Sequence, residues 1–201
     1  MSDPYLTDFT DADGVYARTA WRLGAAARST DHPFRLFTLA TVGPDRYPHA
    51  RTVVLRGFDP VARLVSFYTD CRSPKVRHMA GEPRVALLFY DPVARLQLRI
   101  PASARLHHED EEAREAWLAC PPDHRALYRG ESAPGVGLDP GVPVAVTPPA
   151  EGEEEVDAFG RFVVVVCHFD ALDVTELHPG GNRRVKLTWS PYGLDIDRLA
   201  P

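Results

Sequence analysis

Cationic and hydroxyl-bearing side chains gather in one part of the sequence, between residues 51 and 75. Arg51 and Arg56 enclose a short apolar run, and the later segment Tyr68-Thr-Asp-Cys-Arg-Ser-Pro-Lys75 adds hydroxyl groups and two more cations. A phosphate monoester carries about two negative charges near pH 7, and its usual partners are arginine, lysine, hydroxyl groups and helix N-termini. These residues could therefore bind a phosphate group, although exposed strands also carry arginines that only meet solvent.

Two further groups of residues invite a chemical interpretation, and neither supports one. His107 and His108 precede Glu109 and Asp110, but adjacent side chains point to opposite faces of a strand, and the carboxylates suit the acidic start of a helix. Cys71 lies beside a cation, yet the sequence places no base next to it. We therefore expect no bound metal and no activated thiol.

Composition and charge narrow the class of protein. The chain has 201 residues and a formal net charge of −5, which excludes a general basic surface for nucleic acid. Cys71, Cys120 and Cys167 are scattered, which argues against a disulfide framework or a thiolate metal site. The N-terminus lacks a leader pattern, and no stretch is long and apolar enough to cross a bilayer. These features predict one cytoplasmic domain, residues 1–201, with no nucleic-acid or membrane partner.

The segments that must position the cationic residues resemble strands joined by tight turns. Residues 34–42 are rich in aromatic and β-branched side chains and end at Gly43-Pro44-Asp45, which predicts a strand followed by a hairpin turn. The run 162–169 is apolar on both faces and predicts a central strand. Further strands are expected at residues 49–55, 64–69, 85–90, 96–106, 172–177, 184–189 and 192–196. The pattern predicts a mainly β fold, a barrel or sandwich with flanking helices.

Few helices are expected. Ser73 and Pro74 suit the cap and the first position of a short helix next to the cationic segment. The segment 130–158 is rich in proline, glycine and glutamate, so we expect a long surface loop there. The expected helices cover residues 14–28, 73–80 and 109–119.

Side-chain alternation separates the two arginines of the strand at residues 49–55. In an extended strand, neighbouring side chains point to opposite faces unless a bulge intervenes. Arg51 and Arg56 therefore need not point the same way. One face is expected to carry Arg51, Val53 and Leu55, and the other Thr52, Val54 and Arg56.

The order of the motifs resembles the FMN-binding core of the pyridoxamine 5′-phosphate oxidase family. The resemblance covers residues 34–106 and 162–201. It implies an antiparallel, Greek-key-like split barrel that forms a homodimer, with FMN lying between the subunits. The motifs that carry it are Arg51-Thr-Val-Val-Leu-Arg56, Phe67-Tyr-Thr-Asp70, Ser73 with Lys75, Glu82-Pro-Arg-Val-Ala-Leu-Leu-Phe89, Arg95-Leu-Gln97 and the turn Pro179-Gly-Gly-Asn-Arg183.

The resemblance also implies roles for individual residues. Gln97 would hydrogen-bond the isoalloxazine ring, while Lys186 and Arg183 would approach from the C-terminal hairpin of the partner subunit. The phosphate and ribityl end of FMN would be held by Arg51, Tyr68, Thr69 and Lys75, with Ser73 at the helix start. The same strand as Arg51 would meet the flavin through Thr52, Val53, Val54, Leu55 and Arg56.

Several positions depart from the family pattern. Arg56 replaces a lysine, and Pro74 replaces an arginine for which Arg72 either substitutes or does not. The family's substrate-binding residues in the middle helices are replaced by Trp117, Pro121 and Arg125, and its C-terminal Arg-x-His signature reads Arg183-Arg-Val185. The departures imply that the cofactor is retained and the substrate is changed.

The resulting hypothesis is an FMN-dependent oxidoreductase that transfers hydride between a small substrate and the flavin, with Arg56 and Arg183 near the substrate. One alternative is true pyridoxamine 5′-phosphate oxidation in a rearranged pocket. Another is a protein that binds flavin, or another cofactor such as haem or a deazaflavin, without efficient turnover.

Overall fold

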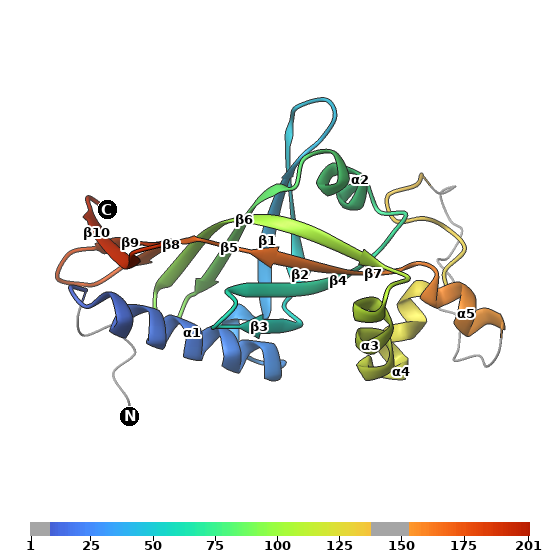
Figure 1. Cartoon of the computed structure of the whole chain (residues 1–201), viewed down its shortest axis with the longest axis horizontal. Coiled ribbons are helices and arrows are strands. Elements are labelled where there is room, and N and C mark those ends of the chain that lie inside the picture. Colours follow the sequence, from blue (N-terminus) through green and yellow to red (C-terminus); the bar gives the residue numbers. More distant parts are fainter. Residues whose placement is uncertain (1–8, 138–152) are drawn as a thin grey trace.

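A computed structural model gives the fold of residues 9–137 and 153–201. In these ranges ten strands form one sheet that curls into a half-barrel, with helices along its margins (Figure 1). The strands are β1 (Leu36–Val42), β2 (Pro48–Val54), β3 (Gly57–Asp59), β4 (Leu64–Asp70), β5 (Arg84–Asp91), β6 (Leu96–His108), β7 (Phe162–His168), β8 (Ala171–Glu176), β9 (Arg183–Ser190) and β10 (Gly193–Leu199). The helices are α1 (Ala12–Arg28), α2 (Pro74–Gly81), α3 (Glu111–Ala119), α4 (Pro122–Arg125) and α5 (Glu153–Phe159), with short 3-10 turns η1 (Pro33–Arg35) and η2 (Ala126–Tyr128).

The long strand β6 joins two parts of the sheet. Its residues 96–99 pair with β8, and its residues 103–108 pair with β7. Neighbouring strands follow the order β10-β9-β8-β6-β5-β1-β2, while β7 continues through β4 to β3. Every pairing between these strands is antiparallel. The expectation of a mainly β, antiparallel fold with flanking helices is therefore confirmed.

The main hydrophobic core lies between the inner face of the sheet and α1. Phe37 stacks on Phe89 with the ring centroids 4.6 Å apart, and Leu23 and Ala26 of α1 are fully buried. Figure 1 shows α1 running along one side of the curled sheet. Every second side chain of β5 is buried because only one face of this strand meets the core.

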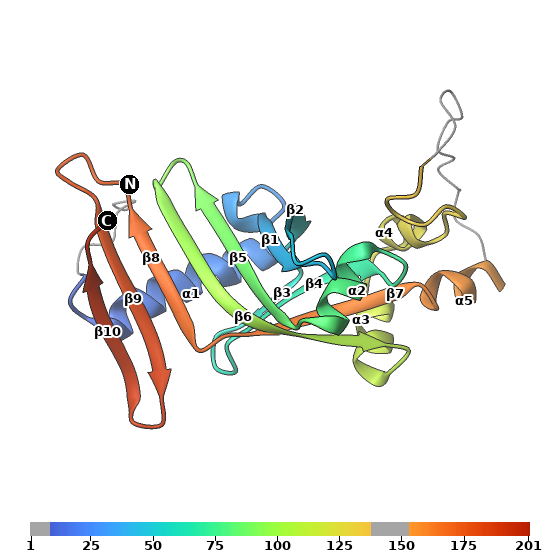
Figure 2. The same ribbon diagram turned by 90° about the horizontal axis from the view of Figure 1, so that it is seen from above.

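The opposite, outer face of the sheet carries exposed apolar side chains. Over β5 and β8, the described helices lie on one side only, and Figure 2 views these strands in front of α1. Leu36, Leu88 and Tyr90 expose about 55, 38 and 45% of their surface there. Because directly opposed residues on paired strands share a face, these side chains adjoin Gln97, which pairs in register with Tyr90.

A second, smaller core explains why β7 is apolar on both faces. Phe162 and Val164 pack with Trp117 of α3 and Tyr128 of η2, whereas Val163 belongs to the main core. Strand β7 pairs with β4 on one side and β6 on the other. The expected central strand is confirmed, and it separates the two cores.

Three local features differ from the sequence-based expectations. Residues 33–35 form η1 before β1, because the His32 ring accepts a hydrogen bond from the backbone of Phe34 and closes a turn. The short strand β3 was not expected and pairs with β4. Helix α5 occupies the end of the expected loop 130–158, and residues 138–152 of that loop lie outside the described residues.

Candidate functional site

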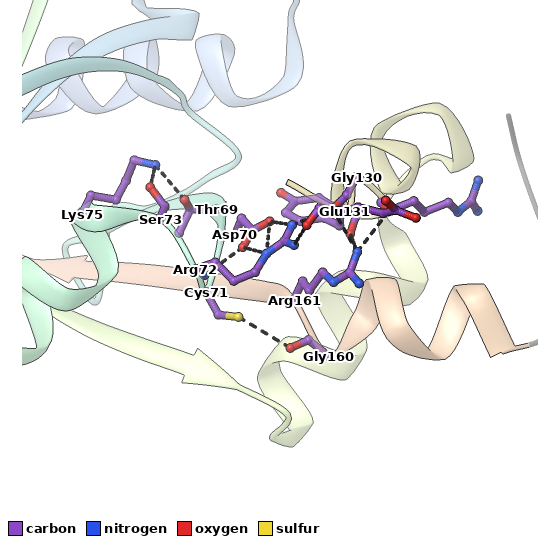
Figure 3. Close-up of polar contacts among 12 residues, drawn as sticks. Thr69, Asp70, Cys71, Arg72, Ser73, Lys75, Gly130, Glu131, Gly160 and Arg161 are labelled. Carbon is purple, nitrogen blue, oxygen red and sulfur yellow. Dashed lines mark hydrogen bonds and ion pairs between the residues drawn. The ribbon is translucent and has the colours of Figure 1, made fainter. Parts of the chain in front are cut away.

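Lys75 lies on the first turn of α2 between two hydroxyl groups. Its Nζ atom donates to Ser73 Oγ at 2.6 Å and to Thr69 Oγ1 at 3.0 Å (Figure 3). Ser73 and Pro74 occupy the cap and the first helical position, as the sequence predicts. The Ser73 hydroxyl accepts from Lys75, however, and makes no hydrogen bond to the helix backbone. The Lys75 ammonium group is thereby held where β4 meets the N-terminus of α2.

Arg51 is anchored on β2 through one of its terminal nitrogens. Nη1 donates to the Thr41 hydroxyl at 2.7 Å and to the backbone oxygens of His49 at 2.9 Å and Leu39 at 3.3 Å. Within the described residues, the Nε and Nη2 atoms make no hydrogen bond. One edge of the guanidinium group is therefore fixed, and the other remains available to a ligand.

Lys75 and Arg51 have no ion-pair partner within the described chain. Burial lowers the pKa of Lys75 and the positive charge of Arg51 lowers it further, while the Asp70 carboxylate opposes part of this shift. Burial also lowers the pKa of Arg51. Neither side chain forms an ion pair with a described carboxylate. The N-terminus of α2 adds positive potential beside Lys75, so this corner of the fold suits an anion.

Arg72 is committed to other partners. Its Nη2 and Nε atoms bind the buried Asp70 carboxylate at 2.7 and 3.0 Å. Nη1 and Nη2 also donate to the backbone oxygens of Glu131 at 3.0 Å and Gly130 at 2.9 Å. Figure 3 shows the guanidinium group directed toward this segment. All three of its nitrogens are used, so the guanidinium group is held toward Asp70 and the segment at residues 130–131.

The segment after η2 is fastened to the same corner of the fold. Arg161 Nη1 donates to the backbone oxygens of Tyr128, Arg129 and Gly130 at 3.2, 3.0 and 3.1 Å (Figure 3). Together with Arg72, this contact holds the first described residues of the expected loop against the connection between β4 and α2.

The strand that contains Arg51 alternates as its sequence predicts. Val53 and Leu55 are buried in the core, whereas Thr52 is exposed on the other face. Val54 and Arg56 are half-buried. Arg56 therefore lies apart from Arg51.

Arg56 has its own surroundings. Its guanidinium carbon lies 5.6 Å from the centre of the Tyr68 ring, and its Nη1 atom lies 3.4 Å from His124 Nδ1 on α4. Burial lowers the pKa of Arg35, and the nearby charge of Arg56 lowers it further. Arg35 donates to the backbone oxygen of Ala27 at 2.8 Å. Arg35 and Arg56 give the region around Tyr68 and His124 a positive potential.

Gln97 lies in a different part of the sheet from Lys75. It pairs in register with Tyr90 of β5 and Thr175 of β8 and has no hydrogen-bond partner for its side chain among the described residues. Helix α2, which carries Lys75, leads into the start of β5 at Arg84. Arg84 pairs with Ser103 of β6. Six residues of extended strand, about 20 Å, separate that position from Gln97.

The C-terminal residues are also remote from Lys75 within one chain. Arg183 forms an ion pair with the buried Glu176 carboxylate, and its guanidinium carbon lies 4.9 Å from the centre of the Phe9 ring. Lys186 is exposed on β9, between β8 and β10. The carboxylate of Glu176 thus neutralises Arg183, which sequence reasoning placed near a substrate.

The positions that replace the family's substrate residues are structural. Trp117 is buried against Phe162, with the ring centroids 5.1 Å apart. The Arg125 guanidinium carbon lies 5.3 Å from the centre of the Trp117 ring, and Arg125 donates to the backbone oxygens of Cys120 and Leu118 at 2.8 and 2.9 Å. These side chains stabilise the small core.

Thr41 and His78 belong to the site and were missed by sequence reasoning. Thr41 Oγ1 lies 3.0 Å from His78 Nδ1 and accepts from Arg51, and both Thr41 and His78 are buried. A threonine in a strand and a histidine in a helix carry no signal of their own, because only the packing of α2 against β1 brings them together. The spacing of Lys75 and His78 on one helix face was the only available indication.

The remaining candidate groups have ordinary partners. His107 Nδ1 lies 2.8 Å from Asp110, and His108 Nε2 lies 2.9 Å from the backbone oxygen of Gly160. A search of the described ranges finds no cluster of histidine, cysteine and acidic side chains suited to a metal ion. The same ranges contain no helix with the length and hydropathy needed to span a membrane.

Comparison with solved structures defines the class of fold. A pyridoxamine 5′-phosphate oxidase-related, FMN-binding protein from Nostoc punctiforme superimposes with a TM-score of 0.71 at 22% identity, covering 92% of this chain and 96% of that one. PhzG from Burkholderia lata, solved with tetrahydrophenazine-1-carboxylic acid, also gives 0.71 at 17% identity, covering 96 and 94%. The fold is that of the FMN-binding split-barrel proteins.

Sequence comparison identifies the family. The family model described as the FMN-binding domain of pyridoxamine 5′-phosphate oxidase matches residues 19–108. The pyridoxine/pyridoxamine 5′-phosphate oxidase of Azorhizobium caulinodans is 40% identical over 93 residues, which are 46% of this chain and 43% of that protein. The chain spans about half the length of such curated relatives. Residues 19–108 therefore carry the FMN-binding domain that the resemblance over residues 34–106 implies, with FMN as the cofactor. The second part of the resemblance, residues 162–201, lies outside this match and stays a prediction.

Proposed function

We propose that this protein is an FMN-dependent oxidoreductase in which Lys75 and Arg51 bind the phosphate of the cofactor. The observation that carries the proposal is that two half-buried cations contact hydroxyl groups and form no ion pair with a described carboxylate. A phosphate dianion would supply the missing charge, accept from Nζ of Lys75 and from the free edge of Arg51, and lie close to the N-terminus of α2. FMN bound there supplies the atom that accepts or gives hydride.

The other residues predicted from the sequence extend this site. Thr69 and Ser73 orient the Lys75 ammonium group. Tyr68 precedes Thr69 on β4, but its ring packs on Phe162 and under Arg56, so it belongs to the region around Arg56. Along β2, the half-buried Val54 and the backbone around Thr52 and Val53 provide a surface for the flavin. Leu55 is fully buried, so only its backbone can take part.

A homodimer with FMN between the subunits accounts for the distance between the residues expected to bind the phosphate and those expected near the flavin ring. Gln97, Arg183 and Lys186 lie on another part of the sheet from Lys75, so one chain does not offer them all to one cofactor. The outer face, with Leu88 and Tyr90 next to Gln97, exposes apolar area suited to a second copy. In a symmetric pair, Gln97 and Lys186 of one subunit would then face Lys75 of the other.

The substrate side favours a compound other than pyridoxamine 5′-phosphate. Trp117 and Arg125 are engaged in the small core, and Arg183 is neutralised by Glu176, so none of them is placed to clamp a substrate phosphate. Arg56 remains, with Arg35 and His124 close by. Their positive charge favours a small substrate with one anionic group.

The test is a titration of the stripped protein with FMN and riboflavin, followed by reduction of the bound flavin with candidate electron donors. Tight binding that depends on the phosphate, and reoxidation of the flavin by a substrate, would support an oxidoreductase. Tight binding with no turnover would indicate a flavin-binding protein without catalysis. Turnover of pyridoxamine 5′-phosphate at an ordinary enzymatic rate would restore the family's own reaction, and equal affinity for the two flavins would refute the phosphate site.

A further inference from the structure

We propose that Thr41 and His78 are positioning residues that hold Arg51 in the orientation needed for the cofactor phosphate. This inference rests on the proposed function of Arg51 and Lys75. Neither residue is part of the motif that relates the chain to its family, and neither was expected from the sequence. Their contribution is indirect: Thr41 contacts Arg51, His78 contacts Thr41, and the free edge of Arg51 is left to the phosphate.

The hydrogen bonds form a chain with one consistent direction. The Thr41 hydroxyl accepts from Arg51 Nη1 at 2.7 Å, the shortest of the three contacts of that nitrogen. Its own proton can then be donated to His78 Nδ1, 3.0 Å away. This assignment requires a neutral His78 with its proton on Nε2, since Nδ1 must accept. Thr41 is 1% exposed, so water does not replace either partner.

Helix α2 links this chain to the other phosphate ligand. Lys75 and His78 are three residues apart, so they lie on one face of the helix. Lys75 reaches the site directly, and His78 reaches it through Thr41 and Arg51. Because Arg51 Nη1 also donates to backbone oxygens of Leu39 and His49, α2 and the pair of strands β1 and β2 together set the separation of the two cations. The phosphate would meet a preformed pair of donors, which reduces the ordering cost of binding.

The hydroxyl of Thr41 can be removed with little change of shape. In Thr41→Val, Arg51 loses the one side-chain acceptor that it has among the described residues, and we expect the ratio of riboflavin to FMN dissociation constants to fall about tenfold. Riboflavin affinity should be unchanged, because the ring site is untouched. Thr41→Ser keeps the hydroxyl and should restore most of the ratio. His78→Asn can still accept a hydrogen bond near the Nδ1 position. Its ratio of riboflavin to FMN dissociation constants should therefore be larger than that of His78→Leu.

The outcomes separate the inference from the function on which it rests. If the wild-type protein does not prefer FMN, the phosphate site itself is wrong. If it prefers FMN but Thr41→Val keeps the same ratio, or loses both flavins equally, the positioning role is wrong. Should the valine variant fail to fold, the ¹⁵N spectrum of His78 in the wild-type protein decides: a proton on Nε2 supports the chain of hydrogen bonds, and a proton on Nδ1 overturns it.

Discussion

The Nζ atom of Lys75 lies 2.6 Å from the hydroxyl of Ser73, the residue that caps α2. A lysine at a helix N-terminus opposes the helix dipole, and here it also faces the charge of Arg51. The arrangement disfavours the charged form of Lys75 unless an anion is present. A bound phosphate would relieve this repulsion between Lys75, Arg51 and the N-terminus of α2.

Lys75→Ala should weaken FMN binding roughly ten- to a hundredfold and leave riboflavin binding nearly unchanged, because only FMN brings the phosphate. Fluorescence titration of the stripped protein with both flavins measures the difference. Arg77→Ala is the matched control, since it removes the same charge from an exposed position on α2. An equal loss of both flavins in Lys75→Ala would contradict the assignment.

The affinity for FMN should fall as the pH rises into the alkaline range. Burial and Arg51 lower the pKa of free Lys75 from 10.5, and a bound phosphate would raise it again. The phosphate contribution is then complete below the pKa of the free form and disappears above the pKa of the bound form. Titrations at increasing pH should show this loss for FMN and not for riboflavin. In Lys75→Arg the loss should move to higher pH, and an unshifted curve would argue that another group titrates.

Gln97→Leu should affect FMN and riboflavin alike, because the expected contact is with the ring that both share. We expect a measurable shift in flavin redox potential or a common loss of affinity. Potentiometric titration of the bound flavin checks the first and binding titration the second. If both quantities match the wild-type values, Gln97 does not contact the ring.

Mixed dimers test whether the cofactor lies between subunits. Lys75→Ala and Gln97→Leu chains, co-expressed with different tags, would form dimers with one intact site and one doubly altered site. Such dimers should contain one site with the affinity and redox potential of the wild-type protein, whereas each parent dimer contains two altered sites. Failure to restore any tight site would mean that both residues serve a site within one subunit.

Arg72→Ala should destabilise the fold and not the phosphate site. Removing Arg72 leaves the buried Asp70 carboxylate without its ion-pair partner and removes one of the two arginines that hold the Gly130 backbone oxygen, at a cost of about 3 kcal/mol. Urea unfolding measures this loss. The preference for FMN over riboflavin should persist in the folded variant, and its disappearance would assign Arg72 to the phosphate after all.

Much of this architecture follows from local sequence. Alternation places Val53 and Leu55 in the core, and Ser73 with Pro74 starts α2, because strand periodicity and capping depend on neighbouring residues. The apolar run of β7 likewise indicates a strand with two buried faces. The motif order was sufficient to predict the family and its cofactor.

The partners of the charged side chains were decided by the tertiary structure. Arg72, a candidate phosphate ligand from its position, is held by Asp70 and Gly130, and Arg183 is held by Glu176. Such ion pairs depend on which strands and loops meet in space, and a charge in the sequence does not name its partner.

The hydrogen bonds of the site were decided in the same way. Thr41 and His78 meet because α2 packs on β1, thirty-seven residues apart in sequence. The sequence by itself determined a split barrel with a cationic corner between β2 and α2. Only the long-range packing decided which cations remain free, since their charge is spent wherever a carboxylate folds against them.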